Sequence, residues 1–299
     1  MKTEPSISSS GILLLDKPVG MTSNAALGQA KRILGLKKAG HTGTLDPLAS
    51  GLLVLCFGQA TKVAGYLLDA EKAYEATLKL GITTDSEDAE GEVIERREVP
   101  ELSESDIDAV LEHFRGSIEQ IPPMYSALKY HGRRLYELAR RGETVARPPR
   151  PVIIHELNLL GHEGDLIELS VRCSKGTYIR SLARDIGKRL ECGAHLIGLR
   201  RTASEPFRVA DAHTLENLQT LTCDDARSLL LPADRALEHL PAVHVDEQQA
   251  ARLQQGQFLS GLPGTEAGNV RIYSPELFVG IGQMDGAGHL RPTRILLTT

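Results

Sequence analysis

A glycine-rich loop that runs directly into an apolar segment constrains the fold most strongly. Residues 40–51 read Gly-His-Thr-Gly-Thr-Leu-Asp-Pro-Leu-Ala-Ser-Gly, with Asp46 as their only acidic residue. The glycines permit sharp turns and the close approach of a ligand, while Pro47 biases Asp46 towards extended geometry. The apolar residues 52–57 are typical of a buried strand. The sequence therefore predicts a stiff loop, anchored by a core strand, that presents one carboxylate.

Asp46 allows two interpretations on local grounds. An ionised carboxylate among apolar neighbours is costly unless a cation or hydrogen bonds compensate it, which makes Asp46 a candidate functional acid. An Asp-Pro turn that caps the next element explains the same residues without any function. Local sequence alone favours the turn, so the decision depends on the rest of the chain.

Five segments, taken in chain order, resemble the motifs of the TruB family of bacterial tRNA pseudouridine synthases. The loop at residues 40–51 resembles the catalytic motif of that family. The other four segments are residues 11–24 (GILLLDKPVGMTSN), 72–74 (KAY), 123–129 (PMYSALK) and 173–180 (CSKGTYIR). The resemblance implies a stand-alone enzyme that isomerises the T-loop uridine of tRNA (U55) to pseudouridine after flipping the base.

Composition is that of an ordinary globular protein. The 299 residues, of which 41% are hydrophobic and 24% charged, suffice for one large domain and one small domain. No apolar stretch approaches about 18 residues, so we expect no membrane association. Residues 1–10 are polar and lack a signal-peptide core, which predicts a disordered N-terminus and a cytoplasmic protein. The four cysteines form no Cys-x-x-Cys pair and are expected to be reduced.

The distribution of charge matters more than the net charge of −5. Residues 124–151 hold seven bases against two acids, and residues 175–201 hold seven against two, whereas residues 81–108 hold eleven acids and two bases. Two basic segments on an acidic chain fit a protein that binds a polyanion on one face. Ordinary solvated surface explains the same pattern about equally well.

Hydrophobic patterns predict an α+β domain around a mixed, mainly antiparallel sheet, because strands and helices alternate irregularly. The expected strands lie at residues 11–15, 52–57, 74–80, 93–99, 152–160, 166–173 and 194–202. The expected helices begin at a Ser23 or Asn24 cap, at residue 60, at a Ser103 capping box and at residue 177. The acids of residues 85–92 are expected in a surface turn. The family resemblance implies the pseudouridine synthase fold.

Residues 122–151 interrupt this pattern with prolines at both ends, which indicates an arm that stands off the core. The candidate RNA-binding residues of the arm are Lys129, Arg133, Arg134, Arg140 and Arg141. In the family the matching insertion is a mobile thumb that grips the tRNA stem-loop.

Beyond Pro232, short strands at 270–273, 277–284 and 294–297 between glycine-rich turns predict a small β-barrel, which the resemblance identifies as a PUA-like RNA-binding domain. We therefore expect a disordered N-terminus at 1–10, a catalytic domain at 11–240 and a PUA-like domain at 241–299.

The resemblance also implies roles for individual residues. Asp46 is the catalytic carboxylate, and Arg180 pairs with it and keeps it ionised. Tyr74 stacks on the target uracil, Tyr178 lines the pocket wall, and Leu199 flanks the base on its apolar side. Without the motifs, the arginine reads as a surface cation and each tyrosine as a core aromatic residue.

His41 matches the family residue that fills the space left by the flipped nucleotides. A histidine that bonds the backbone of its own turn is the alternative. The sequence shows no phosphate-binding loop, no dinucleotide motif and no histidine cluster of zinc type, so we expect no cofactor and no metal. That expectation matches a reaction that breaks a C–N bond, turns the uracil over and rejoins it through carbon.

The expected partner is the T stem-loop of tRNA, bound by a monomer without a guide RNA. The main alternative is a non-catalytic tRNA-binding or folding chaperone on the same scaffold. A guide-dependent synthase of archaeal or eukaryotic type would lack the insertion at 122–151. An aspartate-nucleophile hydrolase would need a metal-binding acidic cluster. Attack at C6, attack at C1′ and a glycal route all remain open.

Overall fold

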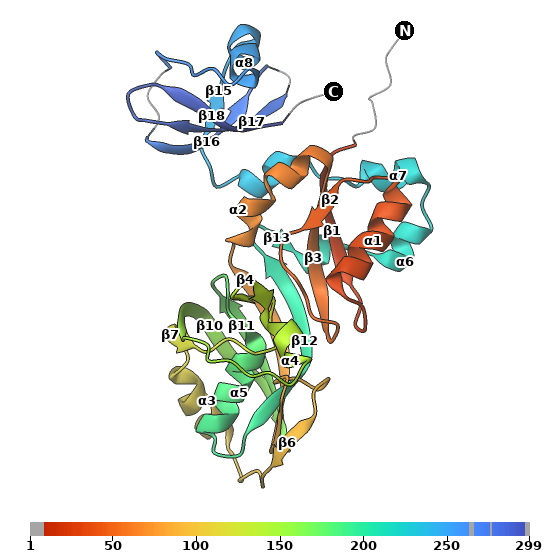
Figure 1. Cartoon of the computed structure of the whole chain (residues 1–299), viewed down its shortest axis with the longest axis vertical. Coiled ribbons are helices and arrows are strands. Elements are labelled where there is room, and N and C mark those ends of the chain that lie inside the picture. Colours follow the sequence, from red (N-terminus) through yellow and green to blue (C-terminus); the bar gives the residue numbers. More distant parts are fainter. Residues whose placement is uncertain (1–8, 263–265, 276, 297–299) are drawn as a thin grey trace.

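The computed structural model describes residues 9–262, 266–275 and 277–296, and its largest unit is a ten-stranded sheet (Figure 1). The expected disordered N-terminus falls mainly on residues 1–8, which lie outside the described residues. The strands follow the order β14-β1-β3-β12-β4-β11-β10-β7, with β2 paired to β3 and β13 to β12. Their bounds are β1 Gly11–Lys17, β2 Ala39–His41, β3 Ala49–Phe57, β4 Lys72–Leu80, β7 Gly116–Gln120, β10 Arg150–Glu163, β11 Leu166–Cys173, β12 Ala194–Ser204, β13 Phe207–Arg208 and β14 His213–Thr214.

Only the β1–β14 and β3–β12 pairs are parallel, and the other pairs of this sheet are antiparallel. The expected mixed, mainly antiparallel α+β architecture is therefore confirmed. The apolar segment after the glycine-rich loop forms β3, where all residues from Gly51 to Phe57 are buried. Because β3 lies inside the sheet, the loop before it has a rigid anchor.

Short helices and 3-10 turns pack around the sheet. They are α1 Ser23–Leu34, α2 Ala64–Leu68, α3 Glu104–Glu112, α5 Ile179–Arg189, α6 Leu215–Gln219 and α7 Cys223–Ser228, with 3-10 turns η1 Gly58–Lys62, η2 Val209–Asp211 and η3 Ala233–Leu237. The Ser103 capping box is present as expected. The cap of α1 is Thr22, whose hydroxyl accepts from the Ala25 N–H, whereas Ser23 is buried and bonds Leu45. The helix expected from residue 60 is split between η1 and α2.

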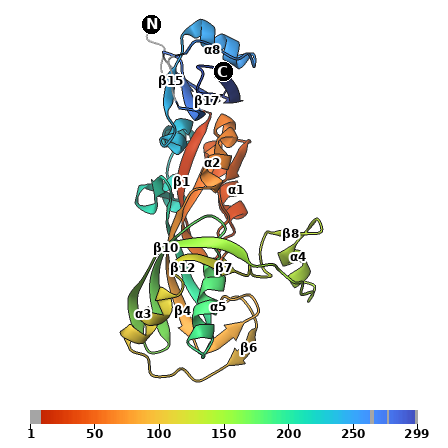
Figure 2. The same ribbon diagram turned by 90° about the vertical axis from the view of Figure 1, so that its left-hand side faces the viewer.

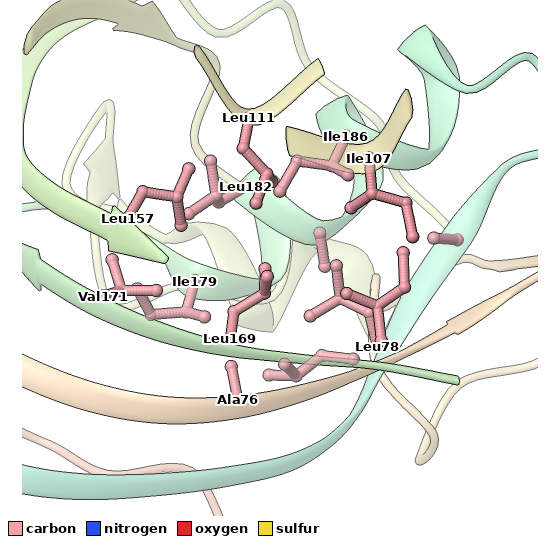
Figure 3. Close-up of a cluster of buried hydrophobic side chains, with 14 of the residues drawn as sticks. Ala76, Leu78, Ile107, Leu111, Leu157, Leu169, Val171, Ile179, Leu182 and Ile186 are labelled. Carbon is pink, nitrogen blue, oxygen red and sulfur yellow. The ribbon is translucent and has the colours of Figure 1, made fainter. Parts of the chain in front are cut away.

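Two apolar clusters lie on different halves of the sheet. Figure 3 shows the first, in which Ile107 and Leu111 of α3 face Leu182 and Ile186 of α5 above the β-sheet residue Leu169. The second packs α1 against β1 and β3. Tyr74 and Leu199 border both clusters, since each is partly buried against residues of either one. These two side chains therefore mark the place where the halves of the domain meet.

The arm leaves the body after β7, as the prolines predicted. Figure 2 shows its hairpin and helix projecting away from the sheet. It contains β8 Lys129–Tyr130, β9 Arg133–Arg134 and α4 Leu135–Ala139, and a small cluster of Met124, Leu135 and Leu138 holds it together. The separate pair β5 Ile82–Thr84 and β6 Val93–Arg96 lies at the far end of the domain.

The C-terminal segment forms a second sheet in the order β15-β16-β17-β18 (Figure 1). Its elements are β15 Ala242–His244, α8 Glu247–Gln254, β16 Gly268–Tyr273, β17 Phe278–Met284 and β18 Leu290–Ile295. The expected closed barrel is not confirmed, because within the described residues β15 and β18 are the two edges of an open sheet. Ile281 of β17 packs in one cluster with Val54 of β3, so this sheet shares apolar core with the larger domain.

Candidate active site

The loop between β2 and β3 presents Asp46 to the first turn of α5. One carboxylate oxygen, Oδ2, lies 3.1 Å from Nη2 of Arg180. The Asp46 side chain keeps 39% of its surface exposed, whereas that of Arg180 keeps only 7%. Burial by the surrounding protein raises the pKa of Asp46 above its usual value, and Arg180 opposes this effect. The site thus holds a carboxylate that a ligand can reach beside a cation that water hardly reaches.

Arg180 joins three parts of the molecule. Its Nη1 donates to the Ser86 carbonyl at 3.1 Å and its Nη2 to the Tyr125 carbonyl at 2.8 Å, in addition to the contact with Asp46. Nη1 also lies 3.6 Å from Oδ2 of Asp88. The interpretation of Arg180 as a solvated surface cation is therefore wrong. The guanidinium connects the loop that carries Asp46, the acidic segment and the root of the arm.

The expectation that residues 85–92 form a surface turn is wrong in its middle part. Glu87 and Asp88 are 8% and 3% exposed. Glu87 accepts a hydrogen bond from Ser181 at 2.7 Å and pairs with Arg184, so α5 supplies the groups that compensate its charge. An acidic cluster reads as surface in the sequence because the basic partners that allow its burial are about a hundred residues away.

Tyr74 and Leu199 lie on the neighbouring strands β4 and β12. Leu199 is opposite Ala49 of β3 and Ala76 of β4, two small residues beside it in the sheet. Burial raises the pKa of Tyr74, so its hydroxyl is protonated at neutral pH. A tyrosine ring and a leucine side chain at one junction form two apolar surfaces of the kind that can contact a planar base.

His41 ends β2 opposite Leu55 of β3. Burial lowers the pKa of this imidazole, and the positive charge of Arg201 lowers it further, so the ring is neutral near pH 7. Its Nδ1 is buried without a hydrogen-bond partner within the described structure. That nitrogen therefore makes no bond to the backbone of its own turn, which was the alternative interpretation of His41.

Tyr178 immediately precedes α5, and the side-chain amide of Gln120 bonds both its main-chain N–H and its main-chain carbonyl. The Tyr178 N–H donates to Oε1 of Gln120 at 2.8 Å, and Nε2 of Gln120 donates to the Tyr178 carbonyl at 3.0 Å. Gln120 is 2% exposed and ends β7, immediately before the arm. The sequence did not single out Gln120, although its place before the Pro122-Pro123 pair is a signal that could have done so.

Two further buried cations surround the loop. Lys17 is fully buried and donates to the carbonyls of Pro18 and Met21, both at 2.7 Å, and desolvation lowers its pKa to about 8. Its charge in turn lowers the pKa of Asp46. Arg201 is 3% exposed, and the sequence had placed it only within a basic segment. The neighbouring residues in the sequence do not predict that either side chain is buried, since lysine and arginine are mostly exposed.

The five basic residues proposed for the arm lie on its surface. Lys129, Arg133, Arg134, Arg140 and Arg141 are all exposed. Throughout the part of the chain that the structure describes, no three His, Cys, Asp or Glu side chains are grouped so that they could hold a metal ion. The same residues include no helix long and apolar enough to cross a membrane.

Three family models match consecutive parts of the chain. The N-terminal domain of the TruB family pseudouridylate synthases matches residues 31–179, the C-terminal domain of tRNA pseudouridylate synthase B matches residues 180–238, and the C-terminal part of pseudouridine synthase II TruB matches residues 241–296. Among curated relatives, the tRNA pseudouridine synthase B of Aromatoleum aromaticum is 52% identical, covering 96% of this chain and 93% of the relative. That of Dechloromonas aromatica is also 52% identical, covering 96% and 95%.

Solved structures share the fold of this protein over nearly its whole length. A crystal structure of a Cbf5-Nop10-Gar1 complex contains a chain with a TM-score of 0.74 and 28% identity, covering 99% of this chain and 88% of that one. A structure of an H/ACA RNP bound to a substrate RNA gives a TM-score of 0.73 and 26% identity, with 99% and 89% covered. The shared fold, the ordered motifs and the close relatives lead to one conclusion: the chain belongs to the TruB family of pseudouridylate synthases.

Proposed function

We propose that the chain is a stand-alone tRNA pseudouridine synthase that isomerises the T-loop uridine U55, with Asp46 as its catalytic carboxylate. Family membership and relatives that are about half identical over nearly their full length make it an isomerase of this class. The observation that carries the assignment of the site is the 3.1 Å pair between Asp46 and Arg180, located in the loop that matches the catalytic motif.

The buried guanidinium gives Asp46 the properties that the reaction needs. Burial alone would keep the carboxyl protonated to higher pH, and Arg180 favours the ionised form. An ionised carboxylate serves whether Asp46 attacks C6 of the base, attacks C1′ of the sugar or stabilises a glycal-type intermediate. The assignment of Asp46 is therefore independent of the route.

The other site residues would hold the flipped base. Tyr74 would stack on the uracil, which is worth roughly 1–3 kcal/mol per base, and Leu199 would contact its other side. Tyr178 would line the wall next to Arg180. His41, neutral because of burial, would occupy the space that the flipped nucleotides leave.

We propose that the arm grips the T stem-loop through phosphate contacts. The five exposed lysine and arginine side chains of the arm form no ion pair within the described structure, so their charges are available to a polyanion. The guanidinium carbons of Arg134 and Arg140 lie 5.9 Å and 5.6 Å from the ring centre of Tyr136, so both side chains contact the same ring. The segment 241–299 would add a second, PUA-like RNA-binding unit to the catalytic domain of residues 11–240.

We also propose that the protein acts in the cytoplasm as a monomer without guide RNA, and the arm within the chain supports the last of these points. The structural relatives come from a Cbf5-Nop10-Gar1 complex and an H/ACA RNP, and both are multi-component assemblies. In this chain residues 122–151 supply a basic surface of their own. A non-catalytic tRNA chaperone is the second candidate, but mere binding needs no carboxylate held against a buried arginine.

The direct test is to incubate the purified protein alone with an unmodified tRNA transcript and to map pseudouridine. We expect modification at position 55 without added RNA or protein. The chaperone alternative predicts tRNA binding with no modification at any position. A requirement for a second RNA would contradict stand-alone action.

A further inference from the structure

Arg201 lies where three elements of the active site meet. In the sheet it is opposite Gly51 of β3, in parallel register, and opposite Tyr74 of β4, in antiparallel register. Its residue is 3% exposed, so water hardly reaches the guanidinium. One side chain of β12 is thus placed between the strand that follows Asp46 and the strand that carries Tyr74.

The guanidinium binds the loop that carries Asp46 and also the strand β3 that follows it. Nη2 donates to the Gly43 carbonyl at 3.1 Å, three residues before Asp46, and Nε donates to the Leu52 carbonyl at 2.7 Å, six residues after it. Because a guanidinium is planar and rigid, the two carbonyls are held in one relative geometry. The loop therefore cannot move away from β3 at Gly43 without breaking this partly buried hydrogen bond.

The glycines of the loop fit around this arginine. A Cβ atom on Gly51, whose φ is +96°, would lie 2.3 Å from the Arg201 carbonyl oxygen and 2.7 Å from its nitrogen. A Cβ atom on Gly43, whose φ is +143°, would lie 3.4 Å from Nη1. Gly51 thus allows β12 to approach the loop closely, whereas at Gly43 the positive φ, and not a lack of space, favours glycine.

The charge of Arg201 is not paired with a carboxylate. The ion pairs of the described residues include Arg200 with Asp16, on the neighbouring position of the same strand, but none that involves Arg201. A buried cation without a counter-ion is costly, and binding two carbonyls requires only neutral donors. The charge faces the site instead, where it lowers the pKa values of His41 and Lys17 and opposes the rise at Tyr74.

We propose that Arg201 is a positioning residue for the isomerisation: its bonds to Gly43 and Leu52 tie the loop that carries Asp46 to β3 and so fix the position of Asp46 relative to Tyr74. The inference rests on the proposed function. In this proposal Arg201 fixes where Asp46 lies relative to the ring of Tyr74. Arg201 itself does not touch the reacting atoms. Loss of Arg201 should therefore reduce the rate of the chemical step and leave tRNA affinity nearly unchanged.

The test compares Arg201→Met and Arg201→Lys with Arg200→Met, a matched control that removes the adjacent arginine and its pair with Asp16. Single-turnover conversion, tRNA dissociation constants and amide hydrogen exchange of residues 43–52 are measured for each folded variant. A displacement of about 1 Å in a catalytic group can cost about 100-fold in rate, so we expect a loss of that order for Arg201→Met. Arg201→Lys should recover part of the rate, and Arg200→Met should resemble the wild type.

Hydrogen exchange separates positioning from general destabilisation. In Arg201→Met, and not in Arg200→Met, exchange should become faster within residues 43–52 while the strands of the C-terminal sheet stay protected. If Arg201→Met does not fold, the comparison of Arg201→Lys with Arg200→Met decides by the same readouts. Equal rates in the Arg201 and Arg200 variants, or a parallel loss of rate and tRNA affinity, would overturn the inference. A wild-type protein without activity would instead contradict the proposed function.

Discussion

Replacing Arg180 by methionine removes a cation that three parts of the candidate active site share. The guanidinium contacts the carboxylates of Asp46 and Asp88 and the carbonyls of Ser86 and Tyr125. Methionine fills a similar space without charge or hydrogen-bond donors. We therefore expect Arg180→Met to lose most of its activity and part of its stability, by a route that differs from the loss of Asp46.

The structure sets the expected size of the stability effect. Removing one partner of a buried ion pair costs roughly 3–5 kcal/mol. The Asp88 side chain is only 5% exposed, so this range applies to the carboxylate left behind there. Asp46 is 39% exposed and water can solvate it, so its contribution is small. The unfolding free energy of Arg180→Met should therefore fall by roughly 3–5 kcal/mol.

The pH dependence gives a second, independent readout. Burial already raises the pKa of Asp46 above 3.8, and Arg180 is the largest influence that lowers it. Without Arg180 the pKa rises further, and each unit corresponds to about 1.4 kcal/mol. The folded variant then keeps its proton to higher pH than the unfolded chain does, so its stability falls as pH rises from about 4 through the raised pKa. If Asp46 acts as the ionised carboxylate, as proposed above, residual activity should increase over the same interval.

Single-turnover conversion of a tRNA transcript, measured from acidic to mildly alkaline pH, is the appropriate assay. Arg184→Met is the matched control, since it removes an arginine one turn further along α5 that pairs with Glu87. That control should keep the wild-type pH dependence of single-turnover conversion, because Arg184 pairs with Glu87 and not with Asp46. Arg180→Lys should be more active than Arg180→Met but impaired, because an ammonium cannot reproduce the planar fork. A wild-type single-turnover rate for Arg180→Met at neutral pH would refute the pairing of Asp46 with Arg180.

Three other outcomes are expected. Asp46→Asn should abolish isomerisation while tRNA binding persists, because it keeps the shape of the side chain but removes its charge and nucleophilicity; turnover above background would contradict the assignment. Arg140→Glu combined with Arg141→Glu should weaken tRNA binding and reduce the slope of log affinity against log salt by about two units, at about 0.9 per lost phosphate contact; an unchanged slope would show that these residues do not touch phosphate. The unfolding free energy of the wild type should rise between pH 8 and 10.5, since the unfolded chain binds the Lys17 proton over this interval and the folded chain does not. Lys17→Met should lack this rise. Titrations of the unfolding free energy that coincide for both proteins would exclude a lowered pKa of Lys17.

Much of the fold could be predicted from neighbouring residues alone. The apolar stripe of α5, the capping box at Ser103 and the strand after the glycine-rich loop depend on side chains a few positions apart, so their patterns are visible in the sequence. The arm could be predicted as well, because prolines at its ends restrict the backbone locally. The open C-terminal sheet could not, because strand spacing alone does not decide whether the edge strands meet.

The sequence by itself determined which chemical groups this protein carries and in which motifs they stand, Asp46 in its loop and Arg180 at the start of a helix. Only the tertiary structure decided what surrounds them. Arg180 bonds the carbonyl of a residue 94 positions away, and Arg201 bonds carbonyls 149 and 158 positions away. Burial of Glu87, Asp88 and Arg201 follows from such distant partners, since a charge leaves water only where the fold brings compensating groups to it.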